Sequence, residues 1–70
     1  MKALNEATTM QTYIIKWMLG ERSVIDLLHD ICLKEGEHVH LLSSNKNYVR
    51  IRHDGHHYAL DCDLACRIKV

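Results

Sequence analysis

The chain contains no proline and no phenylalanine, and it has only three glycines and one tryptophan among 70 residues. With 47% hydrophobic residues it lacks the composition of a disordered tail, so we expect it to fold. The longest apolar run, residues 13–15, is far too short to cross a lipid bilayer, and no membrane association is expected. No repeat, low-complexity tract or nucleotide-binding loop is present, and no motif points to a known family.

The charge is balanced, because nine basic and nine acidic side chains give a formal net charge of zero. This balance argues against a protein that coats nucleic acid or an anionic membrane by bulk charge. Five of the six histidines follow Glu35, so the second half of the chain carries most of the groups that titrate near neutral pH. An electrostatic partner must therefore be met by a local patch.

Three cysteines, Cys32, Cys62 and Cys66, cannot all pair within one molecule. The sequence does not open with the charged and apolar regions of a secretory signal, so we predict a cytoplasmic protein. A chain of this length can build one small core. We therefore expect a single domain over residues 1–70, with residues 1–7 poorly ordered and a homodimer as an open alternative.

The spacing of histidine and cysteine is not typical of a metal centre, and we predict no metal and no cofactor. Structural zinc sites usually show Cys-x2-Cys or His-x3-His pairs, and the cysteine pair Cys62-x3-Cys66 is not convincingly either. A cluster of His53, His56 and Cys62 near the predicted turn keeps zinc binding as a lesser alternative. Cys32 follows His29 by one helical turn, but no third group or oxyanion site accompanies them, so we predict no enzymatic activity.

Two N-terminal segments bear helical signals. In residues 8–19, Thr8 with Gln11 fits a capping box, whereas the β-branched and aromatic residues favour a strand. We favour a helix there, with a strand as the alternative. Residues 23–35 are predicted as a helix because their apolar residues recur at helical spacing before a glycine stop; these residues are Val24, Leu27, Leu28 and Ile31.

After Gly36 the spacing of apolar residues changes from the helical period to a period of two. This alternation predicts strands over residues 38–42, 48–53 and 56–62 and a short edge strand over residues 67–70. The predicted fold class is α+β. One or two N-terminal helices pack on one face of a C-terminal antiparallel three- or four-stranded β-meander. If residues 8–19 form a strand, the order becomes βαβββ.

The Asp54-Gly55 pair between alternating apolar residues predicts a two-residue type I′ hairpin turn. This turn sets four cross-strand pairs, Arg52 with His57, Ile51 with Tyr58, Arg50 with Ala59 and Val49 with Leu60. A three-residue loop over residues 45–47 sets three more, His40 with Arg52, Leu41 with Ile51 and Leu42 with Arg50. Both loops satisfy the same burial pattern.

Alternation then divides the sheet into two faces. The predicted core face holds Val39, Leu41, Val49, Ile51, Tyr58, Leu60 and Cys62. The predicted outer face holds His38, His40, Tyr48, Arg50, Arg52, His57 and Asp61. The candidate partner-binding residues are His40, Tyr48, Arg50, Arg52 and His57.

These observations predict a small non-enzymatic regulatory or inhibitory protein that binds a larger protein through its outer sheet face. Small size, balanced charge and surplus apolar residues such as Trp17 favour a protein partner. The alternative is binding of single-stranded RNA or DNA by the same face, where a tyrosine could stack a base and arginines could meet phosphates. The zero net charge and the absence of phenylalanine weigh against nucleic acid.

Overall fold

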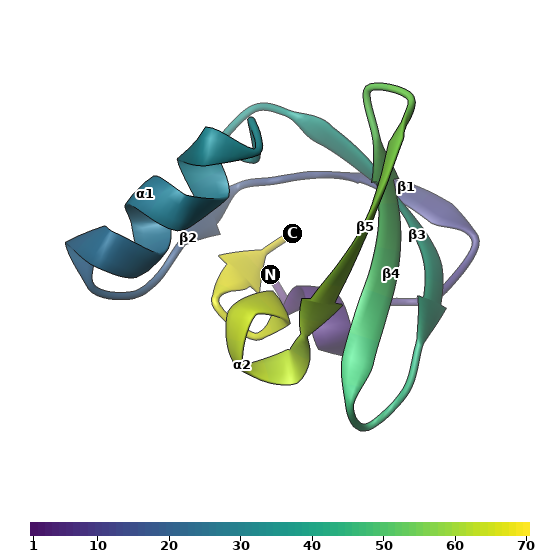
Figure 1. Cartoon of the computed structure of the whole chain (residues 1–70). Helices are drawn as coiled ribbons and strands as arrows, with labels where there is room; N and C mark the ends of the chain where they lie inside the picture. The colour runs from purple at the N-terminus through teal and green to yellow at the C-terminus, as the bar shows by residue number, and fades with distance from the viewer.

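The computed structural model describes residues 1–70 and contains a four-stranded and a two-stranded antiparallel sheet (Figure 1). The elements are η1 (Leu4–Glu6), β1 (Gln11–Ile14), β2 (Trp17–Met18), α1 (Arg22–Asp30), β3 (His38–Ser44), β4 (Tyr48–His53), β5 (His56–Asp61), α2 (Cys62–Ala65) and β6 (Ile68–Lys69). The larger sheet has the order β1-β3-β4-β5, and β2 pairs with β6. The molecule is thus mostly antiparallel sheet with short helices.

The helix favoured for residues 8–19 is wrong, and the strand alternative is right. β1 pairs with β3, and β2 pairs with β6 after the chain crosses from one sheet to the other. At the crossing, the Ile15 amide donates to the Glu37 carbonyl at 2.9 Å and the Lys16 amide donates to the Lys69 carbonyl at 2.8 Å. Pairing with two strands distant in sequence provides hydrogen-bond partners for the backbone N–H and C=O groups of this stretch, which is rich in β-branched and aromatic residues. The local capping signal for a helix is therefore overridden.

The β4–β5 hairpin confirms the predicted register. The four pairs set by the Asp54-Gly55 turn are all present. Asp54 has φ 51° and Gly55 has φ 79°, the two positive values that a type I′ turn requires. A turn of this type matches the right-handed twist of its strands, which is why the dipeptide alone was a sufficient signal.

The β3–β4 connection differs from the prediction by one residue. The Asn45 side-chain oxygen accepts from the Asn47 and Tyr48 amides at 2.7 and 2.9 Å, and this closes a tighter turn than the predicted loop. Ser43, not Leu42, therefore lies opposite Arg50, and a β-bulge between Leu41 and Ser43 restores the predicted pairs of Leu41 and His40. Restoring them keeps the apolar side chains of both strands on the core face.

Helix α1 ends at Asp30, six residues before the glycine expected to stop it. The Leu33 amide donates to the Leu28 carbonyl and the Cys32 amide to the His29 carbonyl, at 3.0 and 2.9 Å, which is the Schellman arrangement. Leu28 and Leu33 are both fully buried, so an apolar contact accompanies the cap. Cys32 occupies the left-handed position at φ 65° and is exposed, outside the helix interior in which it was placed.

Replacement of Cys32 by glycine is expected to stabilise the protein by about 1 kcal/mol. A side chain in the left-handed region costs about 1–2 kcal/mol, and the greater freedom of glycine in the unfolded chain cancels part of that gain. Urea denaturation of C32G and of C32A measures this effect. C32A keeps a Cβ in the same backbone position and should stay near the wild type, so an equal gain in both variants would assign the effect to the thiol.

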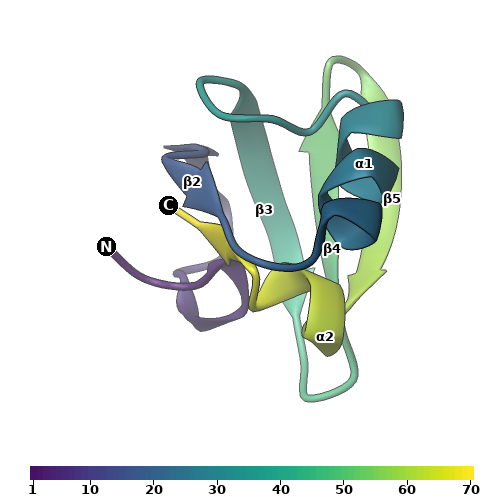
Figure 2. The same cartoon turned by 90° about the vertical axis from the view of Figure 1, so that its left-hand side faces the viewer.

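The packing of a helix across the sheet is not confirmed. Within α1 only Leu28 is fully buried, while η1 and α2 lie against β4 and α2 also lies against β5. In Figure 1 α1 stands beside β2, whereas α2 lies nearer the large sheet; Figure 2 shows α1 and α2 from the side. Residues 67–70 were expected at an edge of the meander, but Ile68 and Lys69 pair with β2 instead.

The core joins the inner face of the sheet to both ends of the chain. Val39, Leu41, Val49, Ile51 and Leu60 are buried as predicted, and Tyr58 and Cys62 are half-buried. The sequence predicts poor order for residues 1–7, whereas in the structure Ala3, Leu4 and Ala7 are buried. The Lys2 and Val70 backbones exchange two hydrogen bonds of 3.2 and 2.9 Å, which hold the two ends together. The N-terminal segment thus fills space that α1 was expected to fill.

Candidate partner-binding face of the sheet

Five predicted residues, His40, Tyr48, Arg50, Arg52 and His57, define what we call the basic sheet face. They come from three adjacent strands, β3, β4 and β5. The burial of β4 alternates strictly, and Tyr48, Arg50 and Arg52 are exposed while the residues between them are buried. His57 is exposed and His40 is half-buried. The alternation places all five side chains on the side of the sheet away from the core.

One row of this face crosses all four strands of the large sheet. Arg52 pairs with His40 on one side and with His57 on the other, and His40 pairs in turn with Thr12 of β1. The Thr12 hydroxyl lies 2.9 Å from His40 Nδ1 and orients that imidazole. Thr12 was missed in the sequence because its segment was expected to be helical. The row therefore sets one guanidinium between two imidazoles.

The second arginine of the face has small neighbours. Arg50 lies opposite Ser43 on β3 and Ala59 on β5, so neither flanking side chain covers it. Arg50 and Arg52 are two residues apart on one face, which separates their Cα atoms by about 7 Å. Two guanidiniums at this spacing can each bind a carboxylate or phosphate through paired hydrogen bonds.

No carboxylate of the chain neutralises these arginines. The ion pairs in the structure are Arg22 with Asp26 and His53 with Glu37, and neither involves the basic sheet face. Asp61 shares this side of the sheet, but its Oδ1 accepts from the Leu64 amide at 2.9 Å and caps α2. This carboxylate is thus engaged with the backbone of α2. Arg50 and Arg52 therefore form no ion pair within the chain.

Tyr48 extends the face toward the β3–β4 turn. It pairs with Asp61, and 42% of its surface is exposed. It is the one aromatic residue of the basic sheet face, because Tyr13 and Tyr58 are half-buried and packed against the core. Base stacking by sheet surfaces commonly uses two or three aromatic side chains. The composition of the face therefore suits acidic groups better than a run of stacked bases.

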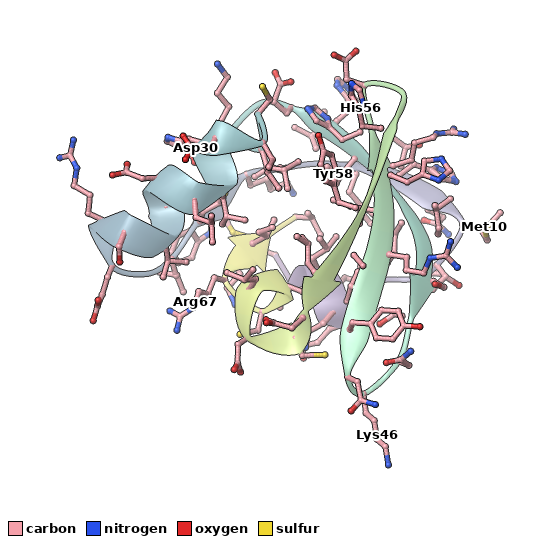
Figure 3. All side chains as sticks on the ribbon, viewed as in Figure 1. Met10, Asp30, Lys46, His56, Tyr58 and Arg67 are labelled. Atoms are coloured by element: carbon pink, nitrogen blue, oxygen red, sulfur yellow. The ribbon has the colours of Figure 1, made fainter.

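The residues considered for zinc do not come together. Figure 3 shows His56 at one tip of the sheet and Lys46 at the other. The Cys62 Sγ lies 3.3 Å from the Lys46 carbonyl oxygen, so Cys62 is at the end away from His56. No group of three or more His, Cys, Asp or Glu side chains is placed to hold a metal ion. The proposed cluster of His53, His56 and Cys62 is therefore wrong.

The burial of His53 is a feature that the sequence analysis did not predict. It follows Val49 and Ile51 at alternate positions of β4, so parity alone puts it on the core face. In the structure it is buried, and its ring contacts Glu37 and the backbone of His38. These two residues, with His53 and Asp54, line a hollow of about 310 Å³ at the hairpin end of the sheet.

Several large apolar side chains lie outside the core. Trp17 is 39% exposed and its indole Nε1 contacts the Met1 sulfur, while Met10 and Leu27 are 68% and 53% exposed. Figure 3 shows Met10 projecting beyond the edge of the sheet. These residues lie on different elements, and the structure shows nothing that covers them. Of the apolar surplus noted in the sequence, Met18 and Tyr13 pack partly on the core.

Neither helix has the length to span a lipid bilayer, since α1 has nine residues and α2 has four.

Comparison with known proteins identifies solved structures that share this fold. No family model and no curated protein matches the chain. Among solved structures, an iron uptake regulatory protein, FeoA, superposes with a TM-score of 0.86 at 24% identity, over 94% of this chain and 89% of that one. A FeoA of Stenotrophomonas maltophilia in complex with zinc gives 0.81 at 14% identity, over 100% and 89% of the two chains. It is described as a prokaryotic SH3 domain protein and a candidate activating factor for ferrous iron transport.

A larger protein contains the same fold as one part. ScaR with bound Zn²⁺ superposes with a TM-score of 0.88 at 20% identity, over 97% of this chain but only 35% of ScaR. None of these three proteins is described as an enzyme. Identities at this level establish the fold alone. The chain therefore has the SH3-like fold of small FeoA proteins, which also occurs as about one third of ScaR.

Proposed function

We propose that this chain is a small non-enzymatic regulatory protein that binds a larger protein through the basic sheet face. The observation that carries the proposal is the adjacent pair Arg50 and Arg52, exposed on the central part of the sheet without a carboxylate partner. Leaving two like charges side by side has a cost in the isolated protein, which an acidic partner would remove. The partner surface is therefore expected to be acidic.

The proteins that share the fold indicate the setting. One is described as an iron uptake regulatory protein and another as a candidate activator of ferrous iron transport, and both are close to this chain in size. We place the partner among the proteins that transport metal ions or respond to them. The regulatory role, whether activating or inhibitory, would follow from occupation of the partner's acidic surface. A homodimer is not required by this mechanism.

Capture of a partner from lysate is the first test. Wild-type chain on beads, with and without nuclease, is expected to retain a defined protein that survives nuclease and is released by about 0.5 M salt, since salt screens charge pairs at a binding surface. The captured protein is then purified, and its affinity for the wild-type chain is measured with no other protein or nucleic acid present. Capture that depends on nucleic acid would overturn the proposal in favour of single-stranded RNA or DNA.

A further inference from the structure

His53 is the one polar residue among the 15 buried residues, with 5% of its surface exposed. Its Nδ1 lies 2.8 Å from the carbonyl oxygen of His38. A carbonyl oxygen can only accept a hydrogen bond, so Nδ1 carries a proton and donates it. In the neutral ring the Nε2 atom is then a bare lone pair, held in a buried position with a set direction.

The Nε2 atom faces the carboxylate of Glu37, with 3.4 Å between Nε2 and Oε1. A neutral imidazole and an ionised carboxylate present two acceptors to one another here, which is repulsive unless a proton or a cation lies between them. The separation is longer than the ~2.7–3.2 Å of an ordinary N–H···O hydrogen bond. The geometry leaves room for an ion larger than a proton.

The separation matches the edge of a zinc coordination tetrahedron. Metal–ligand bonds of about 2.1 Å at tetrahedral angles put neighbouring ligand atoms about 3.4 Å apart. Donation of the second ring nitrogen to a backbone carbonyl is also the arrangement that orients histidines toward metals. We propose that His53 Nε2 and the Glu37 carboxylate bind a divalent cation of the zinc type between them.

The surroundings supply room and further ligands. The hollow of about 310 Å³ beside the pair is lined by Glu37, His38, His53 and Asp54, all of them residues that ligate zinc. Only two donors converge in this structure, so a third comes from rotation of the exposed Asp54 side chain or from water. Such a site binds more weakly than a closed four-ligand site and can exchange its ion.

The backbone holds the two donors independently of any ion. Glu37 enters β3, and its carbonyl accepts the Ile15 amide at the crossing between the two sheets. His53 ends β4 and pairs with His56 across the type I′ turn. The pair is thus set by three strands that the core already stabilises. This proposal therefore does not depend on the basic sheet face or on its partner.

Titration of the untagged chain with ZnCl₂ at neutral pH tests the site. We expect saturable binding and an upfield-shifted ¹⁵N resonance of His53 Nε2 in long-range ¹H–¹⁵N spectra, which identify the ligating nitrogen residue by residue. Glu37→Gln, at a residue whose side chain is 39% exposed, should keep the fold and weaken zinc binding at least tenfold. The matched control, His29→Gln, removes an exposed imidazole on α1 and should leave the affinity unchanged.

Two results would overturn the proposal. One is equal zinc affinity in the wild type and in Glu37→Gln, with the resonances of exposed histidines or the thiols of Cys32 and Cys66 perturbed instead, which would mean adventitious binding only. The other is a His53 ring that carries protons on both nitrogens at neutral pH and keeps them at saturating zinc. That result would identify the contact with Glu37 as a plain ion pair.

Discussion

The double substitution Arg50→Glu and Arg52→Glu is expected to lower affinity for the captured partner roughly 100-fold or more, because close charge pairs at interfaces contribute about 1.5–7 kcal/mol each. Both guanidiniums are exposed and lack a carboxylate partner within the chain, so their reversal removes no internal ion pair. The fold should therefore persist. Isothermal titration with the purified partner measures the loss, and circular dichroism checks the fold.

A matched control separates a local site from bulk charge. Arg22→Glu with Lys34→Glu makes the same change in net charge at exposed positions in and just after α1. This variant should keep affinity within about threefold, because charges beyond a Debye length of roughly 8–10 Å are largely screened. Equal loss in both double variants would mean that net charge alone attracts the partner. Unchanged affinity after reversal of Arg50 and Arg52 would move the binding surface away from the sheet.

Leu4→Ala is expected to lower the free energy of unfolding by about 2–5 kcal/mol, the usual cost of truncating a fully buried leucine. Leu4 is 0% exposed and belongs to the core cluster, although it is only the fourth residue of the sequence. For a chain of this size such a loss approaches the whole stability, of the order of 5 kcal/mol. Urea denaturation followed by circular dichroism measures the change.

Glu6→Ala provides the control within the same turn, since Glu6 is exposed. It should alter stability by less than about 0.5 kcal/mol, as surface substitutions usually do. If Leu4→Ala were as mild as Glu6→Ala, residues 1–7 would not be part of the core in solution, and the poor order predicted from the sequence would hold.

Local sequence signals were sufficient to predict the structure where the hydrogen-bond partners of a segment lie close to it in the sequence. The Asp54-Gly55 turn and the alternation of β4 and β5 determined the register of the hairpin, because a slip by one residue would carry every apolar side chain into water. The same parity correctly placed Arg50, Arg52 and His57 on the exposed side. The same alternation, followed to the last residue of β4, also puts His53 on the buried side.

Local signals failed where a distant strand supplied the hydrogen bonds. Residues 11–18 have features of both helix and strand, and pairing with β3 and β6 decided between them. The early end of α1, with Cys32 in the left-handed position after it, had no sequence signal, because a cysteine rarely adopts a positive φ. The buried contact of Leu28 with Leu33 made that conformation favourable.

The amino-acid sequence by itself determined the hairpin, the two faces of its strands and the residues of the basic sheet face, since these depend on a period of two and one turn. Only the tertiary structure decided that Asp61 caps α2, and that Glu37, just before β3, contacts His53 at the end of β4. Both contacts join residues whose approach depends on how separate elements pack. That packing is set by burial of the whole core, which no local pattern encodes.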